Sequence, residues 1–278
     1  GPVGASGQAA GGFTSLIMPA WLPGLCYGVK TVNVAPHNAA RGLPGLHSTY
    51  LLYDAATGAP LALLDGDQIT ARRTAAASAL AASFLARAEA GHLLLVGAGQ
   101  VARLLPAAMR TVRPIRQVTV WARQPAAAAT LAAQLRAEGF DSAPATDLPA
   151  AVAAADIVSC ATLATAPLVQ GAWLQPGSHL DLIGSFTPAM READDACFQG
   201  AALYVDTDEA LAKGGDLLGP LQRGVLTPAS VCGTLATLAC GQAPGRSSAA
   251  QRTVFKSVGT ALEDLAAAML VCGLPLPG

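Results

Sequence analysis

The stretch HLLLVGAGQVARLL, residues 92–105, joins an apolar, strand-like run to a helical pattern through a glycine-rich turn. The first glycine, Gly97, allows a tight turn from strand to helix, and the second, Gly99, lets the backbone approach a pyrophosphate. The third position needs only a small residue for packing of helix on strand, and Ala102 meets that need. The turn therefore fits a dinucleotide-binding βαβ unit, provided that the chain around it alternates strands with helices.

The surrounding sequence shows this alternation. Strands are predicted at 93–96, 118–121, 141–145, 156–160, 179–183 and 203–206, and helices at 101–109, 125–138 and 148–154. Alternation of this kind is typical of an α/β fold with a doubly wound parallel sheet of the Rossmann type. At the start of the first helix, Gln100 and Val101 offer free N–H groups and the positive end of the helix dipole to an anion. Pro106 lies inside that helix and predicts a kink or an early end.

The end of the second predicted strand, in VTVWARQP, indicates which dinucleotide is preferred. A site for NAD places an acidic residue here to hold the ribose 2′-hydroxyl, whereas an arginine accommodates the 2′-phosphate of NADP. No acidic residue occurs between Val118 and Pro125, and the turn is occupied by Arg123 and Gln124. The sequence therefore favours NADP(H) over NAD(H), unless Arg123 is only a solvated loop residue.

The flanking segments do not continue the alternation. Residues 46–64 read as a β-hairpin, and residues 68–88 as a long alanine-rich helix. After Pro228, helices are predicted at 229–240 and 253–271. We therefore expect a Rossmann domain at 90–228, and a second α+β domain for substrate binding and dimerisation built from 1–89 and 229–278.

Two basic residues lie in strongly apolar surroundings. Lys30 is in the strand-like run CYGVKTVNV, where an amine is costly to bury without a partner. Arg73 follows Arg72 near the start of the alanine-rich helix, where a basic side chain opposes the helix dipole unless an anion is near. An arginine can hold a carboxylate through two hydrogen bonds. The alternatives are that Lys30 extends its amine from a strand edge into water, and that one arginine is a surface residue.

Composition excludes several other classes of protein. The net charge is −1 and the pI is about 6.5, which gives no basic surface for nucleic acid. No apolar run is long enough for a membrane helix, and the six scattered cysteines form no metal-binding pattern, so we expect a cytoplasmic protein without a metal. The opening GPVGASGQAAGG lacks the basic start and apolar core of a signal peptide, and we expect it to lack the true N-terminus.

Several segments resemble the ornithine cyclodeaminase/mu-crystallin family. In family order, these are MPAWLPG with GVKTV (18–32), ITARRTAAASALAA (69–82), VGAGQVA, DLIGSFTPAMRE (181–192), VDTDEAL (205–211), GRSS and TVFKSVGTALEDLAAA (253–268). Nothing before Phe13 matches the family's first segment, which carries a further substrate arginine.

The resemblance implies a homodimer that binds a nicotinamide cofactor and a small amino or imino acid. It places Lys30 and Arg73 at the substrate carboxylate, with Lys30 as the catalytic residue. It also places Thr74, the GAGQVA turn and Arg123 at the cofactor. Thr162 and Leu163 follow the strand DIVSC and are implied to lie near the nicotinamide.

Two departures from the family's cyclodeaminases bear on the activity. Those enzymes carry an aspartate in the segment matching IGSFTP, where this chain has Ser185 and Phe186, and a phenylalanine has no proton to transfer. They also use NAD and have an acidic residue after the second strand, where this chain has Arg123. Both departures favour the reductase branch of the family.

The sequence thus predicts an NAD(P)H-dependent oxidoreductase that reduces a small cyclic imino acid, of the pyrroline- or piperideine-2-carboxylate type, or interconverts an α-amino and an α-keto acid. One alternative is an NAD-dependent ornithine cyclodeaminase, which makes proline and ammonia. The other is a binding protein of the mu-crystallin type that uses NADPH to hold a ligand without turnover.

Overall fold

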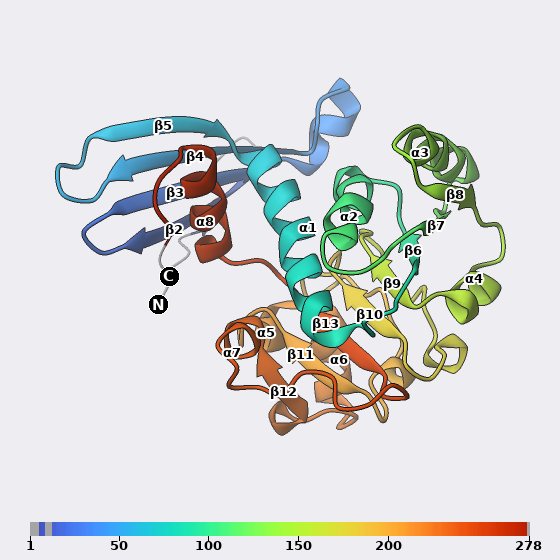
Figure 1. The fold of residues 1–278 in the computed structure, drawn as a ribbon. Helices are drawn as coiled ribbons and strands as arrows, with labels where there is room; N and C mark the ends of the chain where they lie inside the picture. The colour runs from blue at the N-terminus through green and yellow to red at the C-terminus, as the bar shows by residue number, and fades with distance from the viewer. Residues whose placement is uncertain (1–5, 9–12, 277–278) are drawn as a thin grey trace. The chain divides into compact units, whose positions relative to one another are not determined.

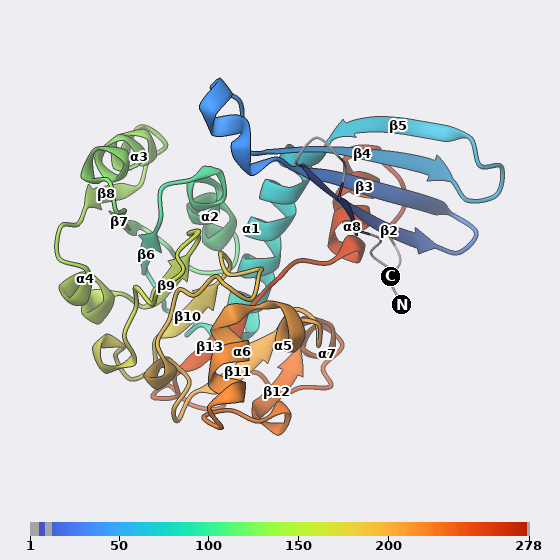
Figure 2. The ribbon, with the colours of Figure 1, turned by 180° about the vertical axis from the view of Figure 1, so that it is seen from behind.

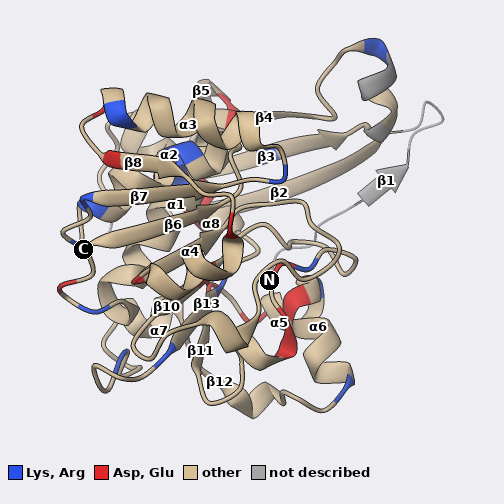
Figure 3. Cartoon of the chain, turned by 90° about the vertical axis from the view of Figure 1, so that its right-hand side faces the viewer, with Lys and Arg blue, Asp and Glu red and all other residues tan. Residues whose placement is uncertain are grey.

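The computed structural model describes residues 6–8 and 13–276, which form two compact units. Unit 1 contains Gly1–Arg73 and Thr260–Gly278, and unit 2 contains Thr74–Gly259. The long helix α1 (Gly66–Leu85) begins in unit 1 and continues into unit 2. Figure 3 shows basic and acidic residues scattered over a mostly uncharged chain.

Unit 1 is an antiparallel sheet with one helix against it (Figure 1). Its strands follow the chain in order: β1 (Ser6–Gln8), β2 (Thr14–Leu22), β3 (Cys26–Val34), β4 (Leu46–Asp54) and β5 (Pro60–Asp65). A short 3-10 helix, η1 (Pro36–Arg41), lies between β3 and β4. Helix α8 (Ala261–Val271) packs against β2, β3 and β4. Alternate strand residues, including Tyr50 and Leu52, are buried in a core that they share with α8.

The opposite face of this sheet is apolar and exposed. Trp21 pairs in register with Tyr27, and Tyr27 pairs with Tyr53, so the three rings lie on one face. The rings of Tyr27 and Tyr53 stack with their centroids 5.5 Å apart. Leu63 lies on the same face through its partner Leu51 and is 70% exposed, and Trp21 is 54% exposed.

Unit 2 is a parallel sheet of eight strands in the order β12-β11-β13-β10-β9-β6-β7-β8. The strands are β6 (His92–Val96), β7 (Gln117–Trp121), β8 (Asp141–Pro144), β9 (Ile157–Cys160), β10 (His179–Leu182), β11 (Ala202–Val205), β12 (Val231–Thr234) and β13 (Thr253–Lys256). Six neighbouring strands of the sheet reproduce the strand order of a dinucleotide-binding Rossmann sheet: β8, β7, β6, β9, β10 and β13. The predicted α/β fold with a doubly wound parallel sheet is confirmed.

Helices cover both faces of this sheet (Figure 2). They are α2 (Gln100–Arg110), α3 (Pro125–Ala137), α4 (Leu148–Ala154), α5 (Ala210–Lys213), α6 (Gly215–Gln222) and α7 (Leu235–Ala239), with the 3-10 turns η2 (Gly171–Trp173), η3 (Asp195–Cys197) and η4 (Pro228–Ser230). In β6, Leu93 and Leu95 pack with α2, α3 and the second half of α1, whereas Leu94 and Val96 pack with α4. The strand is apolar throughout because both of its faces are buried.

The predicted helices at 229–240 and 253–271 are wrong in part. Residues 231–234 form β12 and residues 253–256 form β13, and only α7 and α8 are α-helical in these ranges. Because β13 is hydrogen-bonded between β10 and β11, residues 229–259 belong to unit 2 rather than to the second domain. The observed boundaries, after Arg73 and Gly259, thus differ from those expected at 89 and 228.

Helix α2 also continues past Pro106 to Arg110, so the predicted early end did not occur.

Candidate active site

The glycine turn after β6 is shaped by the neighbouring loop. Gly97 has φ +118°, and a Cβ added to it would lie 2.6 Å from the carbonyl oxygen of Ala161, just after β9. The protein's own packing therefore requires glycine at this position. Gly99 precedes the first turn of α2 with an ordinary extended backbone, and a Cβ added there would meet no atom within 4 Å. At Gly99 the structure leaves open space in front of a helix N-terminus, where an anion is favoured.

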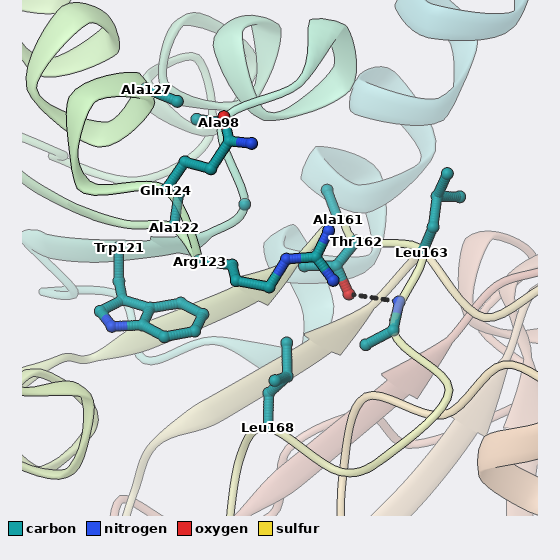
Figure 4. A pocket seen from close by; sticks show the side chains of 12 residues that line it. Ala98, Trp121, Ala122, Arg123, Gln124, Ala127, Ala161, Thr162, Leu163 and Leu168 are labelled. Atoms are coloured by element: carbon teal, nitrogen blue, oxygen red, sulfur yellow. Dashed lines mark hydrogen bonds between the residues drawn. The ribbon is translucent and has the colours of Figure 1, made fainter. Parts of the chain in front are cut away.

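A cavity of about 330 Å³ lies beside this turn, at the carboxyl ends of β6, β7 and β9 (Figure 4). Four of the predicted site residues line it: Gly97, Arg123, Thr162 and Leu163. The side chain of Arg123 points across the cavity toward Thr162, and Leu163 is 72% exposed. Ligands of open α/β sheets bind in this place, where the strand order reverses direction.

The other predicted cofactor residues do not line this cavity. Gln100 and Val101 form the first turn of α2 next to it, and Thr74 is buried within α1. Trp121 and Gln124 line the cavity next to Arg123, on the side away from Leu163 (Figure 4). None of its twelve lining residues carries a carboxylate. The wall after β7 therefore presents a cation where NAD-specific sites present an acid.

Behind the cavity wall lies a buried carboxylate that the sequence analysis missed. Glu192 accepts hydrogen bonds from Thr162 N at 2.7 Å and Thr162 Oγ1 at 2.8 Å, and from Gly184 N at 2.7 Å. Burial raises the pKa of Glu192, an effect that the nearby Lys256 opposes. Asp216, which is also buried, accepts a hydrogen bond from the backbone N–H of Glu192. Gly184 is eight residues away in the same segment, but Thr162 is thirty residues away, so the sequence offered no local signal for the contact between Glu192 and the Thr162 loop.

A second buried cluster lies in unit 1. Lys30 is on the face of β3 that packs against α8, and its Nζ lies 2.6 Å from Asp264 Oδ2 and 3.2 Å from Thr70 Oγ1. Arg73 donates from Nε to Asp264 Oδ1 at 2.9 Å and from Nη1 to Glu263 Oε2 at 3.0 Å. The two predicted substrate residues are thus brought together by one carboxylate.

Burial changes the pKa of the lysine in this cluster. Lys30 is 2% exposed, and burial lowers the pKa of its amine, while the charge of Asp264 opposes the shift. Asp264 and Glu263 were not predicted as site residues. A signal was present, because two adjacent acidic residues interrupt the apolar pattern of the last helix.

The structure also shows the surroundings of the segment in which cyclodeaminases carry an aspartate. Ser185 is buried and donates a hydrogen bond to Met190 O at 2.7 Å, and Phe186 is 45% exposed. Within residues 6–8 and 13–276, no cluster of three or more His, Cys, Asp or Glu could hold a metal ion. The same part of the chain contains no helix long and apolar enough to cross a membrane.

Comparisons with known proteins agree with this architecture. The model of the ornithine cyclodeaminase/mu-crystallin family matches residues 8–273. A delta(1)-pyrroline-2-carboxylate reductase of Paracoccus denitrificans is 47% identical over 254 residues, which cover 91% of this chain and 80% of that protein.

Two solved structures also match nearly the whole chain. Delta(1)-pyrroline-2-carboxylate reductase of Thermococcus litoralis, in complex with NADH and L-proline, matches with a TM-score of 0.90 and 32% identity, over 100% of this chain and 89% of that one. An archaeal alanine dehydrogenase dimer with bound NAD matches with a TM-score of 0.91 and 29% identity, over 98% and 84% of the two chains.

Proposed function

The chain belongs to the ornithine cyclodeaminase/mu-crystallin family, and from this we propose that it reduces a small cyclic imino acid, of the pyrroline- or piperideine-2-carboxylate type, with NAD(P)H. The cavity at the glycine turn of unit 2 carries the proposal, because its position at the carboxyl ends of the strands suits a nicotinamide dinucleotide. The bound ligands of the Thermococcus litoralis enzyme, NADH and L-proline, support the same chemistry.

The residues of unit 2 fit such a cofactor. The open space at Gly99 and the N-terminus of α2 suit the pyrophosphate, and Thr162 and Leu163 form the wall that would face the nicotinamide. We assign Arg123 to the 2′-phosphate of NADP(H), since the cavity has no carboxylate to hold a ribose 2′-hydroxyl. A bound nicotinamide supplies the hydride that reduces the imine carbon.

The buried cluster of unit 1 fits the other half of the reaction. Reduction of an imine also needs a proton on the nitrogen, and a lysine with a lowered pKa is a stronger acid than a solvated one. We assign this proton to the ammonium of Lys30. Arg73 is assigned to the substrate carboxylate, and Asp264 holds both cations in place.

We also propose that the protein is a homodimer. The exposed apolar face of the unit 1 sheet, with Trp21 and Leu63, is the kind of surface that a second copy covers. The archaeal alanine dehydrogenase with which the chain aligns is itself a dimer.

Cofactor oxidation with a panel of substrates tests the activity. Loss of NADPH absorbance with pyrroline-2-carboxylate or piperideine-2-carboxylate is expected, and K30A should lower kcat by about a hundredfold or more. Ammonia release from ornithine with NAD, without net reduction, would instead identify a cyclodeaminase. Cofactor binding without turnover in either assay would identify a binding protein.

A further inference from the structure

Three loops of unit 2 meet at very close range beside the cavity. They follow β6, β9 and β10, which are adjacent parallel strands, so their carboxyl ends are neighbours. A Cβ on Gly184, after β10, would lie 2.0 Å from the carbonyl oxygen of Thr162, after β9. Ala161 makes the matching close approach to Gly97, after β6. The loop that carries Thr162 is thus enclosed by loops on both sides.

Glu192 fixes this loop through hydrogen bonds. Its Oε1 accepts both donors of Thr162, and its Oε2 accepts the N–H of Gly184. The hydroxyl of Thr162 also accepts a hydrogen bond from Ala164 N at 3.2 Å. The side-chain rotamer of Thr162 and the turn to Ala164 are therefore set by one fully buried carboxylate.

Glu192 is itself held in place by a neighbouring pair of buried charged residues, Asp216 and Lys256. Asp216 Oδ1 accepts the backbone N–H groups of Glu192 at 2.8 Å and of Ala193 at 3.0 Å. Lys256, fully buried in β13, lies 3.5 Å from Asp216 Oδ2. A buried carboxylate with this many partners has little freedom to move, which suits it to hold a neighbouring loop rigidly.

We propose that Glu192 is a positioning residue for the nicotinamide half of the cofactor, through Thr162 and Gly184; this rests on the proposed function. A dinucleotide whose pyrophosphate lies at the start of α2 extends over β7 on one side and over β9 on the other. Arg123 marks the side that takes the adenosine ribose, so the Thr162 loop faces the nicotinamide. Glu192 would act on only one half of the cofactor.

Binding of two ligands to E192Q tests this. The glutamine Oε1 can still accept from Thr162, but its amide nitrogen cannot accept from Gly184 N. The Kd of NADPH should rise about tenfold, the scale of one lost hydrogen bond to a charged group. The Kd of 2′,5′-ADP, which lacks the nicotinamide half, should not change. E138Q removes an exposed carboxylate and should leave both values as in the wild type.

Turnover gives an independent readout. With imino acid and NADPH deuterated at C4, E192Q should show a lower kcat and a larger isotope effect than the wild type, because hydride transfer becomes slower. Equal weakening of NADPH and 2′,5′-ADP would show that Glu192 only stabilises the fold, and would overturn the proposal, as would unchanged NADPH binding.

A second variant serves if E192Q does not fold. T162V removes the hydroxyl that donates to Glu192 and accepts from Ala164 N, and it keeps the backbone N–H that donates to Glu192. It should weaken NADPH binding less than E192Q does and leave the Kd of 2′,5′-ADP unchanged. If none of the imino acids tested supports oxidation of NADPH by the wild type, the proposed function fails. The comparison of the Kd values of NADPH and 2′,5′-ADP still decides the role of Glu192.

Discussion

Asp264 Oδ2 lies 2.6 Å from Lys30 Nζ, although the two residues come from opposite ends of the chain. The same carboxylate accepts a hydrogen bond from Arg73 through its other oxygen. One buried acid in α8 therefore holds two cations that would otherwise repel each other. With Glu263, which pairs with Arg73, the cluster carries two positive and two negative groups, so burial does not leave an uncompensated charge.

Replacing Asp264 by asparagine should damage both stability and catalysis. Loss of the charge leaves the buried ammonium of Lys30 without its ion-pair partner and Arg73 with Glu263 alone, which should lower the free energy of unfolding by about 3–5 kcal/mol. It also removes the charge that keeps the pKa of Lys30 from falling further, so the basic limb of the pH profile of kcat/KM should move to lower pH. Urea unfolding and the pH profile measure the two effects. E263Q, at a partly exposed site, is the control and should lose less stability; equal losses would contradict this account.

The two glycines of the turn should respond differently to alanine. At Gly97 the new Cβ would collide with Ala161 O, and φ is in the left-handed region, so G97A should lower both the unfolding midpoint and cofactor affinity. At Gly99 the Cβ meets nothing in the protein, so G99A should keep wild-type stability and still bind NADPH at least about tenfold more weakly. Thermal unfolding and NADPH titration separate these results. Unchanged NADPH binding by G99A would show that the cofactor does not approach this backbone.

Cofactor choice should depend on Arg123. R123A removes the cation that the cavity offers to a 2′-phosphate, and we expect the Kd of NADPH to rise about ten- to a hundredfold, the value of a charge-assisted contact. The Kd of NADH should change little. Arg103, exposed on α2 and paired with Glu138, supplies the matched control R103A. Tighter binding of NADH than of NADPH by the wild type would refute the assignment.

The exposed face of the unit 1 sheet should be needed for dimerisation. L63K places a charge at a site that is 70% exposed in the isolated chain, so it should not disturb folding. If a second copy covers this face, burying the lysine is costly and the variant should be a monomer in sedimentation experiments. L270K, at a comparably exposed leucine on α8, should stay dimeric. A dimeric L63K would place the interface elsewhere.

The sequence allowed most of unit 2 to be predicted, because its strands and helices differ clearly in length and pattern. Residues 253–256 were missed because a short buried strand, TVFK, cannot be told by periodicity from the apolar helix after it. A boundary signal was nevertheless present: Thr260 and Glu263 form the capping box that begins α8.

The sequence indicated some residues of the candidate site but not all of them. Gly97, Arg123, Thr162 and Leu163 do line one cavity, since local motifs follow adjacent parallel strands. Asp264 was marked by its acidic pair in an apolar helix, but the partners of Asp264 and the contact of Glu192 with Thr162 could not be assigned from sequence, because only the fold brings these residues near. Family resemblance supplied the fold and the activity class, but it did not indicate these two carboxylates.

Asp181 should make stability depend on pH in the opposite sense to a typical carboxylate. It is fully buried in β10, where it accepts hydrogen bonds from Ser159 Oγ at 2.8 Å and Ser78 Oγ at 3.1 Å. Burial raises its pKa to about 7 from 3.8. Between these values the folded chain holds a proton that the unfolded chain releases. The stabilisation is therefore complete below pH 3.8 and is lost as pH rises toward 7.

The variant D181N carries no ionisable group at this position and can still hydrogen-bond to both serines. The difference in free energy of unfolding between D181N and the wild type should therefore increase by roughly 4 kcal/mol in favour of D181N as the pH is raised across that window. Urea unfolding at several pH values measures it, and other titrating groups cancel in the difference. D208N removes an exposed carboxylate as the control. A difference that is constant with pH would show that Asp181 is already ionised in the folded protein.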